Sequence, residues 1–311
     1  MLIIIFSLNR AIFLHTLLKS LEWNIKNKNI EVIILYNYTN AFYKSGYDKL
    51  INTFNYRFMK EENIRRDSFK EYLGYPRNLL RLIKYKPYRN HKTNFRFVLV
   101  NEILNSKYSE LMFLTDDSLF YREFEVTDEI IQNILSNPFN NSFHLRFGLN
   151  YERKPNNITT EGNICSWYLN KNNDKDYSYR FSIDGQIYNK ELLLRIMRKI
   201  IFINPTTLEG NINYYCSKKN LLKNGFCFKE SVLVGFELNI VSNMSNNNNL
   251  NIDNKLLNKY YLDGYEMKYI FDSNNVRSYR PYLNDVLLLK GDKNISVLNN
   301  FQKIKDGKYR D

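Results

Sequence analysis

The chain has 311 residues, of which 44% are hydrophobic and 25% charged. This composition is typical of a globular protein with a substantial core and excludes a disordered one. Its 45 Lys and Arg against 32 Asp and Glu give a net charge of +13, which attracts polyanions such as nucleic acid, an anionic membrane or phosphorylated small molecules. The abundance of Asn, Lys, Ile, Tyr and Phe is equally typical of AT-rich coding, so the charge alone selects no partner.

The cysteines and the N-terminal segment indicate a cytoplasmic protein. Cys165, Cys216 and Cys227 form no CxxC motif and cannot all pair, which favours a reducing compartment without structural zinc. The apolar opening has no basic leader or small-residue cleavage site and is interrupted by Asn9 and Arg10. We therefore expect neither a signal peptide nor a spanning helix, and leave open a peripheral contact with the inner face of the cell membrane.

The first 118 residues alternate between strands and helices, as in an α/β fold. Leu2–Phe6 is a continuous apolar run, and the range Arg10–Ile25 carries apolar residues at helical spacing. A second apolar run, Glu31–Tyr36, completes a βαβ unit with parallel strands. A third strand, a helix and a buried strand are predicted at Asn55–Lys60, Thr93–Asn105 and Leu111–Thr115, respectively.

The periodicity changes after residue 118. Asn141–Gly148 and Tyr179–Tyr188 alternate like strands, and His144 is expected on a strand face that points away from the core. A helix is predicted over Lys190–Ile201, and a second helix is predicted to start at Leu208-Glu209, after Pro205-Thr206-Thr207. Toward the C-terminus the sequence predicts a low-complexity loop, a helix and an apolar strand, at Ser242–Asn251, Lys255–Leu262 and Val286–Leu289.

Two adjacent carboxylates follow the predicted strand Leu111–Thr115. Asp116 and Asp117 interrupt the largely apolar stretch SELMFLTDDSLFY, residues 109–121. One interpretation is a tight turn, because Asp accepts hydrogen bonds from the backbone that follows it. The other is a divalent cation, Mn²⁺ or Mg²⁺, which prefers carboxylate and phosphate oxygens and would screen the repulsion within the pair. The C-terminal end of a strand favours the cation, because ligands of open α/β sheets bind there.

The segment VNEILNSKYSELMFLTDDSLFY resembles GT-A-fold, family-two-like glycosyltransferases, in particular those that build bacterial surface glycans such as capsule or lipooligosaccharide. In that family a helix with an Asn leads into a strand that ends in a DxD-type motif, and Asn101 lies fifteen residues before Asp116. The resemblance implies that Asn101 and Asp116 face the nucleotide and that Asp117 binds the metal. The chain departs from the family at Val100, where an Arg is usual, and at Ser118, where a third carboxylate would stand.

The opening IIIFSLNRA resembles the first strand and nucleotide loop of the same enzymes. The resemblance places Ser7, Asn9 and Arg10 near the nucleotide, and it offers Tyr36 or Tyr38 as a ring that stacks on the base. It implies a GT-A fold with a Rossmann-like nucleotide half and a mixed central sheet. Residues 1–118 would bind the nucleotide-sugar, 119–240 the acceptor, and 241–311 would form a C-terminal extension with a mobile Asn-rich loop.

An inverting enzyme of this family needs one general base near the acceptor hydroxyl, usually a carboxylate. The family places it at a helix start, where Glu209 in NPTTLEGN fits best, although an acid there also stabilises a helix whatever its function. Asp184 in SIDGQIY is the competing base or an ordinary turn residue, and Gly185 would let a sugar approach the backbone. Trp167 would stack on the acceptor sugar or belong to the core. Retaining chemistry would need neither carboxylate.

Two other classes of function compete with this one. The charge of +13 suggests a nucleic-acid or anionic-polymer binding protein, but outside the cluster Arg77–Lys92 the basic residues are scattered and no nucleic-acid-binding signature occurs. A sugar nucleotidyltransferase would open with a Gly-rich loop, and FSLNRA has no Gly. The sequence therefore predicts a metal-dependent glycosyltransferase with a nucleotide-sugar donor, a glycan or lipid-linked glycan acceptor, and no nucleic-acid partner.

Overall fold

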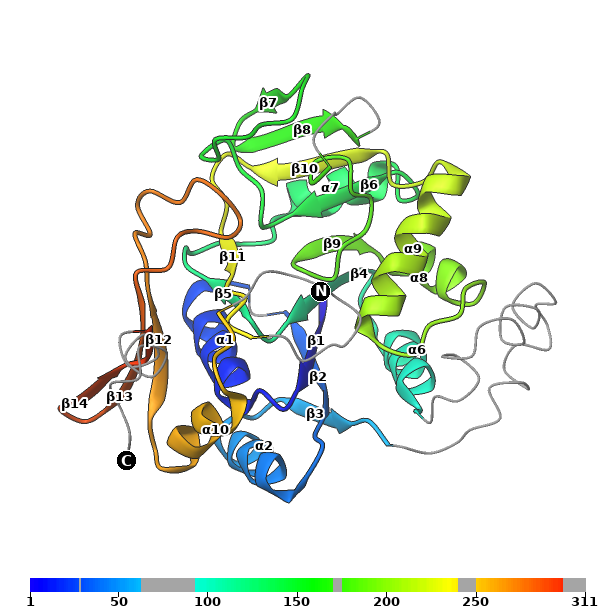
Figure 1. The fold of residues 1–311 in the computed structure, drawn as a ribbon. Coiled ribbons are helices and arrows are strands. Elements are labelled where there is room, and N and C mark those ends of the chain that lie inside the picture. Colours follow the sequence, from blue (N-terminus) through cyan, green and yellow to red (C-terminus); the bar gives the residue numbers. More distant parts are fainter. Residues whose placement is uncertain (28, 63–92, 170–174, 240–249, 299–311) are drawn as a thin grey trace.

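The computed structural model describes residues 1–27, 29–62, 93–169, 175–239 and 250–298, and a nine-stranded central sheet runs through this part of the chain. The strands are β1 (Leu2–Leu8), β2 (Glu31–Asn37), β3 (Arg57–Lys60), β4 (Glu110–Thr115), β6 (Asn141–His144), β7 (Thr159–Glu161), β8 (Ile164–Tyr168), β9 (Gln186–Asn189) and β10 (Asn224–Phe228). Their order across the sheet is β3-β2-β1-β4-β9-β6-β10-β8-β7 (Figure 1).

The sheet is parallel at one end and mixed at the other. Strands β3, β2, β1 and β4 are parallel to one another. Strand β9 is antiparallel to both β4 and β6, β10 is parallel to β6, and β8 is antiparallel to both β10 and β7. The predicted α/β class with a mixed central sheet is confirmed. Residues 1–118 and 119–240 contribute to the same sheet, and the predicted boundaries between them stay predictions.

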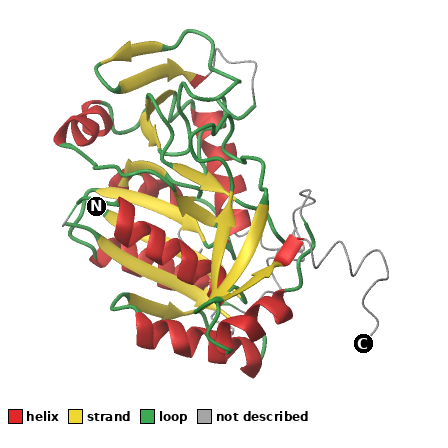
Figure 2. Cartoon of the chain, turned by 90° about the vertical axis from the view of Figure 1, so that its left-hand side faces the viewer, coloured by secondary structure: helices red, strands yellow, loops and turns green. Residues whose placement is uncertain are grey.

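Helices cover both faces of the sheet (Figures 1 and 2). On one face the apolar side chains pack with those of α1 (Ala11–Asn24), α2 (Ala41–Thr53), α7 (Asp128–Ser136) and α10 (Asn254–Leu262). On the other face they pack with α6 (Phe95–Asn105), α8 (Lys190–Met197) and α9 (Pro205–Lys219). In β1, Ile3 and Ile5 face the first group and Leu2 and Ile4 the second. Burial on both faces explains why this strand reads as a continuous apolar run.

Two small sheets complete the fold. Strand β5 (Ser118–Phe120) follows β4 almost directly and pairs antiparallel with β11 (Leu233–Gly235). A three-stranded antiparallel sheet contains β12 (Glu266–Ile270), β13 (Asp285–Lys290) and β14 (Lys293–Ser296). Strand β12 contacts α1, so the C-terminal part of the described chain packs beside the first helix of the βαβ unit.

The predicted elements of the first 118 residues are confirmed, together with the helices near 190, 205 and 255 and the strand near 286. The strand predicted at Tyr179–Tyr188 is wrong for its first seven residues, since β9 begins at Gln186. There the backbone N–H of Ser182 donates to the side chains of Gln186 and Tyr188 rather than to a neighbouring strand. These side chains satisfy a backbone group that a strand would otherwise pair.

The exposed position predicted for His144 is also wrong. Its side chain is buried, contacts Gln186, and stacks on Phe147, because this part of the sheet is covered on both faces.

The cluster Arg77–Lys92 lies outside the described residues, as does most of the predicted loop Ser242–Asn251. None of the helices in the described ranges has the length and apolarity needed to cross a membrane.

Candidate active site

The candidate site lies where β1 and β4 end. These strands are parallel neighbours and Phe6 pairs with Thr115, so their C-terminal ends meet at one edge of the sheet. Asp116 and Asp117, the turn carboxylates, form the two-residue turn between β4 and β5. The turn interpretation is therefore confirmed for the local backbone. The two adjacent carboxylates still need a positive charge that balances them.

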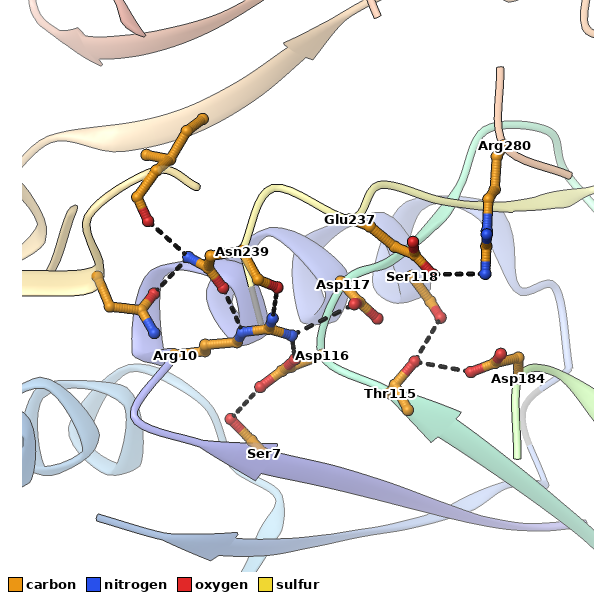
Figure 3. A network of polar contacts seen from close by, with 12 residues as sticks. Ser7, Arg10, Thr115, Asp116, Asp117, Ser118, Asp184, Glu237, Asn239 and Arg280 are labelled. Carbon is orange, nitrogen blue, oxygen red and sulfur yellow. Dashed lines mark hydrogen bonds and ion pairs between the residues drawn. The ribbon is translucent and has the colours of Figure 1, made fainter. Parts of the chain in front are cut away.

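Arg10 balances the turn carboxylates from the start of α1 (Figure 3). Its Nη1 lies 3.0 Å from Oδ1 of Asp116 and 3.2 Å from Oδ2 of Asp117. The hydroxyl of Ser7 donates to the remaining oxygen of Asp116 at 2.7 Å. The guanidinium is 6% exposed and Asp116 only 3%. A buried ion pair with further hydrogen bonds is the arrangement in which such charges are tolerated.

The pKa values of these groups follow from burial and pairing. Burial raises the pKa of Asp116 to about 6, against the opposing effects of Arg10 and Ser7. Burial would lower the pKa of Arg10, but Asp116 and Asp117 raise it above its ordinary value. Arg10 therefore stays cationic, and the charge that the sequence analysis assigned to a metal ion is supplied at least in part by this guanidinium.

Asn239 holds Arg10 from the other side. Its Oδ1 accepts from Nε of Arg10 at 2.8 Å, and its backbone oxygen accepts from Nη2. The Nδ2 group of Asn239 donates to the backbone oxygen of Ile252 and to Oδ1 of Asn254 (Figure 3). Asn239 thus connects the βαβ unit to the start of α10. No sequence pattern marks this residue, because its contact with Arg10 joins positions 229 apart in the chain.

Asp117 is the more accessible turn carboxylate. Its side chain is 17% exposed, and only Oδ2 takes part in a hydrogen bond among the described residues. Its backbone oxygen accepts from the amide of Phe236, which fixes the turn. Arg146 and Glu237 lie close enough for their charges to interact with that of Asp117. One carboxylate oxygen of the pair is therefore available to a ligand.

Asp184 lies beside the turn, in the loop before β9 (Figure 3). Its Oδ1 accepts from the hydroxyl of Thr115 at 2.8 Å, and its Oδ2 forms an ion pair with Arg146 at 2.7 Å. Thr115 is the last residue of β4, so one hydrogen bond joins Asp184 to the strand that carries the turn carboxylates. Arg146 is half-buried and is a further residue of the site for which the sequence carries no signal.

Glu209 lies one turn into α9. Asn204 is the N-cap of this helix, forms a capping box with Thr207, and Pro205 follows it. The capping alternative for Glu209 is therefore wrong. The Oε1 atom of Glu209 accepts instead from the backbone amide of Ile183 at 3.3 Å.

Glu209 and Asp184, which we call the second carboxylate pair, interact electrostatically. Burial and, secondarily, the charge of Asp184 raise the pKa of Glu209 to about 7, although Ser182, Ile183 and Arg146 act in the opposite direction. Thr115 and Arg146 place this pair next to the turn carboxylates. A carboxyl group with a pKa near neutrality beside an ionised neighbour is suited to accepting a proton.

Backbone conformation and packing explain why residue 185 is a glycine and residue 167 a tryptophan. Gly185 has φ +80°, and a Cβ atom there would lie 2.1 Å from a methyl carbon of Leu233. Trp167 is 3% exposed, donates from Nε1 to the backbone oxygen of Tyr177, and covers Gly225. The burial of Trp167 favours the core interpretation over stacking on an acceptor sugar.

The remaining predicted nucleotide contacts lie on both sides of β1. Asn9 has φ 57° and bonds to Thr39, so it connects the loops after β1 and β2. Tyr36 is buried and packs on the ring of Tyr47, whereas Tyr38 is half-buried. Asn101 is half-buried on α6 and, among the described residues, makes no hydrogen bond to the turn carboxylates. The structure thus brings Ser7 and Arg10 to the pair, but not Asn101.

The donor set fits a divalent cation only in part. Within the described ranges, no three Asp, Glu, His or Cys side chains are grouped so as to hold a metal. A free oxygen of Asp117 at a partly exposed position nevertheless suits Mg²⁺ or Mn²⁺, which proteins often hold through one or two carboxylates together with substrate phosphates. The residues present fit a cation that arrives with a diphosphate.

Comparisons with known proteins found distant structural similarity. No family model and no curated protein matches the chain. TarS of S. aureus is 16% identical with a TM-score of 0.42, over 75% of this chain and 36% of that one. A TarS fragment in complex with UDP-GlcNAc gives 14% and 0.42, over 75% and 57%. An active-site mutant of LgtC gives 13% and 0.32, over 63% and 59%.

The chain thus aligns with about a third to three-fifths of the lengths of these structures. With TM-scores below 0.5 and identities of 16% or less, the similarities assign neither a family nor an activity to it.

Proposed function

We propose that the chain is a glycosyltransferase that moves a hexosyl or related sugar from a nucleoside diphosphate to an acceptor hydroxyl. The observation that carries this proposal is the meeting of two carboxylate pairs at the C-terminal ends of β1 and β4, joined through Thr115 and Arg146. That edge is where open α/β sheets bind ligands. The resemblance of TDDS and IIIFSLNRA to the motifs of GT-A enzymes supports the same conclusion.

In this proposal the turn carboxylates serve the donor. Asp117 would hold Mn²⁺ or Mg²⁺ through its available oxygen, and the cation, when bound, supplies stabilisation of the diphosphate leaving group. Asp116 is 3% exposed with both oxygens occupied by Ser7 and Arg10, so we assign it the role of fixing the turn rather than touching the nucleoside. Tyr38, the more accessible of the two tyrosines, would stack on the base.

The second carboxylate pair would handle the proton. Both oxygens of Asp184 already accept from charged or hydroxyl donors, so neither is open to an acceptor hydroxyl. Glu209 has a raised pKa and no ion pair of its own among the described residues. We therefore assign Glu209 as the base that takes the proton of the acceptor hydroxyl, and Asp184 as the group that holds Arg146 and, after burial, helps to raise the pKa of Glu209. Such a base implies that the configuration at the anomeric carbon of the transferred sugar is inverted.

The proposed chemical class of the acceptor rests only on the resemblance of the sequence motifs. Enzymes with similar motifs extend bacterial surface glycans such as capsule or lipooligosaccharide, and their acceptors are glycans or lipid-linked glycans. We propose the same class for this chain, at the cytoplasmic side of the membrane.

A thermal-shift screen tests the donor assignment. The protein is melted with UDP-, GDP-, CMP- and dTDP-sugars, each with and without Mn²⁺. We expect one nucleotide family to raise Tm, with a larger shift in Mn²⁺, because a ligand that binds only the folded state stabilises it. Asp117→Asn should remove the Mn²⁺-dependent part of the shift. A protein that no nucleotide stabilises would overturn the proposal.

A further inference from the structure

Two of the three cysteines, far apart in the sequence, lie directly opposite each other in the sheet. Cys165 on β8 is the cross-strand partner of Cys227 on β10, and both side chains are buried in the same apolar cluster. The two thiols lie close enough for each to change the pKa of the other. Cys216 is buried in the cluster on the other face of the sheet. We propose that Cys165 and Cys227 form a site of reversible oxidation that closes into a cross-strand disulfide.

The backbone geometry permits this bond. The amide of Lys229 donates to the oxygen of Asn163, its cross-strand partner two residues from the cysteines. Hydrogen-bonded and non-hydrogen-bonded pairs alternate along an antiparallel ladder, so Cys165 and Cys227 form a hydrogen-bonded pair. The Cα atoms of such a pair are about 5.5 Å apart, within the range of roughly 4.4–6.8 Å that a disulfide spans. The Cβ atoms of such a pair lie about 5.5 Å apart, against roughly 3.5–4.5 Å in a disulfide, so closure needs a local approach of the two strands on the order of 1 Å.

The two thiols differ in reactivity. Interaction with the thiol of Cys227 lowers the pKa of Cys165 to about 6, whereas the interaction with Cys165, together with burial, raises the pKa of Cys227. Cys165 is therefore the nucleophile, because the thiolate is the reactive form. It is reached from the edge of the sheet, where the exposed three-residue strand β7 places Thr160 opposite Cys165 with 3.6 Å between its Oγ1 and the sulfur. Opening of this edge strand exposes the thiol.

The reaction is a thiol–disulfide exchange with a small disulfide such as oxidised glutathione. The thiolate of Cys165 attacks one sulfur of that disulfide and releases one small thiolate. Cys227 loses its proton and attacks the sulfur of Cys165 in the mixed disulfide, which releases the second small thiolate. The protein loses two hydrogens overall, and the small disulfide becomes two thiols.

The bond would close a loop that contains β9, α8 and α9, with Asp184 and Glu209 inside it. A covalent link across the β8–β10 pair restricts the unfolded chain, so the oxidised protein should be the more stable form. This inference rests on the position of the thiols and does not depend on the proposed activity.

Peptide mapping of the full chain tests the inference. Folded, fully reduced protein is incubated with oxidised glutathione, unfolded in the presence of an alkylating agent, and digested without reduction. We expect one dominant linked peptide that joins Cys165 to Cys227, with Cys216 alkylated. Tm should rise on the order of 5–10 °C on oxidation.

Three substitutions complete the test. Cys216→Ser should behave as the wild type, whereas Cys165→Ser and Cys227→Ser should each lose the linked peptide and the gain in Tm. The inference is overturned if the folded wild type keeps three free thiols, if stable glutathione adducts accumulate instead of the link, or if Cys216 takes part in it. The wild-type peptide map decides the matter even where a variant fails to fold.

Discussion

The two carboxylate pairs of the candidate site lie at one edge of the sheet and balance their charge differently. Arg10 contacts both turn carboxylates and is itself held by Asn239. In the second pair, Arg146 contacts Asp184 alone, and Glu209 receives only hydrogen bonds. The first pair therefore has a shared cation, and the pKa of Asp116 is raised only to about 6, whereas Glu209 in the second pair has no such contact and a pKa of about 7.

This difference shows how contact with an arginine affects the pKa of a buried carboxylate. Burial raises the pKa of a carboxylate in both pairs, but less where a guanidinium opposes it, to about 6 for Asp116 against about 7 for Glu209. A neighbouring carboxylate without that contact has its pKa raised by burial and by the charge beside it. The same chemical group is thus suited to hold a ligand in one place and to take a proton in the other.

The largest effect is expected from Glu209→Gln. If Glu209 is the base, sugar transfer should fall roughly 10²–10⁴-fold, while donor binding stays unchanged. Glu191→Gln is the matched control, since Glu191 is exposed on α8 and, in the part of the chain that the structure describes, forms an ion pair with Arg195 alone, one turn away. Full activity in Glu209→Gln, with loss of activity in Asp184→Asn, would reverse the assignment of the base.

The next effect concerns the fixed pair. Arg10→Ala should lower the free energy of unfolding by about 3–5 kcal/mol, because it leaves two buried or half-buried carboxylates without their cation. Arg195→Ala should cost less than about 1 kcal/mol, since its ion pair with Glu191 is exposed. Urea unfolding at neutral pH measures both values. Equal losses in the two variants would contradict the role given to Arg10.

Gly185 tests how Asp184 is held. Gly185→Ala should destabilise the protein by roughly 2–4 kcal/mol, because φ is +80° and the added methyl group would overlap Leu233. Gly162→Ala offers a control with φ +53° and open space around the Cβ position, for which about 1 kcal/mol is expected. A loss in Gly185→Ala no larger than that in the control would mean that Leu233 moves aside.

The smallest effect is a pH dependence of stability. The pKa of Glu209 is about 7 in the folded chain against an ordinary value of 4.5, so the folded state binds the proton more tightly. The contribution of Glu209 to stability is therefore greatest below about pH 4.5 and falls as pH rises toward 7, by on the order of 1–2 kcal/mol for a half-buried group. Between pH 5 and pH 8, urea unfolding should show a smaller loss in Glu209→Gln than in the wild type, because Glu61 and Asp116, with pKa values raised to about 7 and about 6, titrate in both proteins. An equal loss in both would assign it to other groups.

Much of the fold could be predicted from sequence because its first half is locally consistent. Strand β1 is apolar on both faces, and α1 begins directly after Arg10 with a regular helical period. The helix α2 was missed because its buried residues include Gly46 and two tyrosines, which make a weak apolar pattern. The loop before β9 was mistaken for a strand because Phe181 and Ile183 alternate like strand residues, although side chains satisfy its backbone.

The candidate site was predictable only where its residues follow strands. Ser7 lies at the C-terminal end of β1, Arg10 follows that strand and the turn carboxylates follow β4, and parallel strands bring their C-terminal ends together. Asn239 and Arg146 carry no such signal, because their roles arise from contacts with residues distant in the sequence. The raised pKa of Glu209 likewise depends on burial and on Asp184, neither of which a sequence pattern reveals.

The central claim is tested most directly by calorimetric titration. The stabilising nucleotide is titrated, in the presence of Mn²⁺, into the wild type, Asp117→Asn and Glu209→Gln. The turn carboxylates are proposed to serve the donor and the second pair the proton. Asp117→Asn should therefore bind the nucleotide at least about tenfold more weakly, and Glu209→Gln should bind it with wild-type affinity. Equal binding by all three proteins, or a loss confined to Glu209→Gln, would contradict the account.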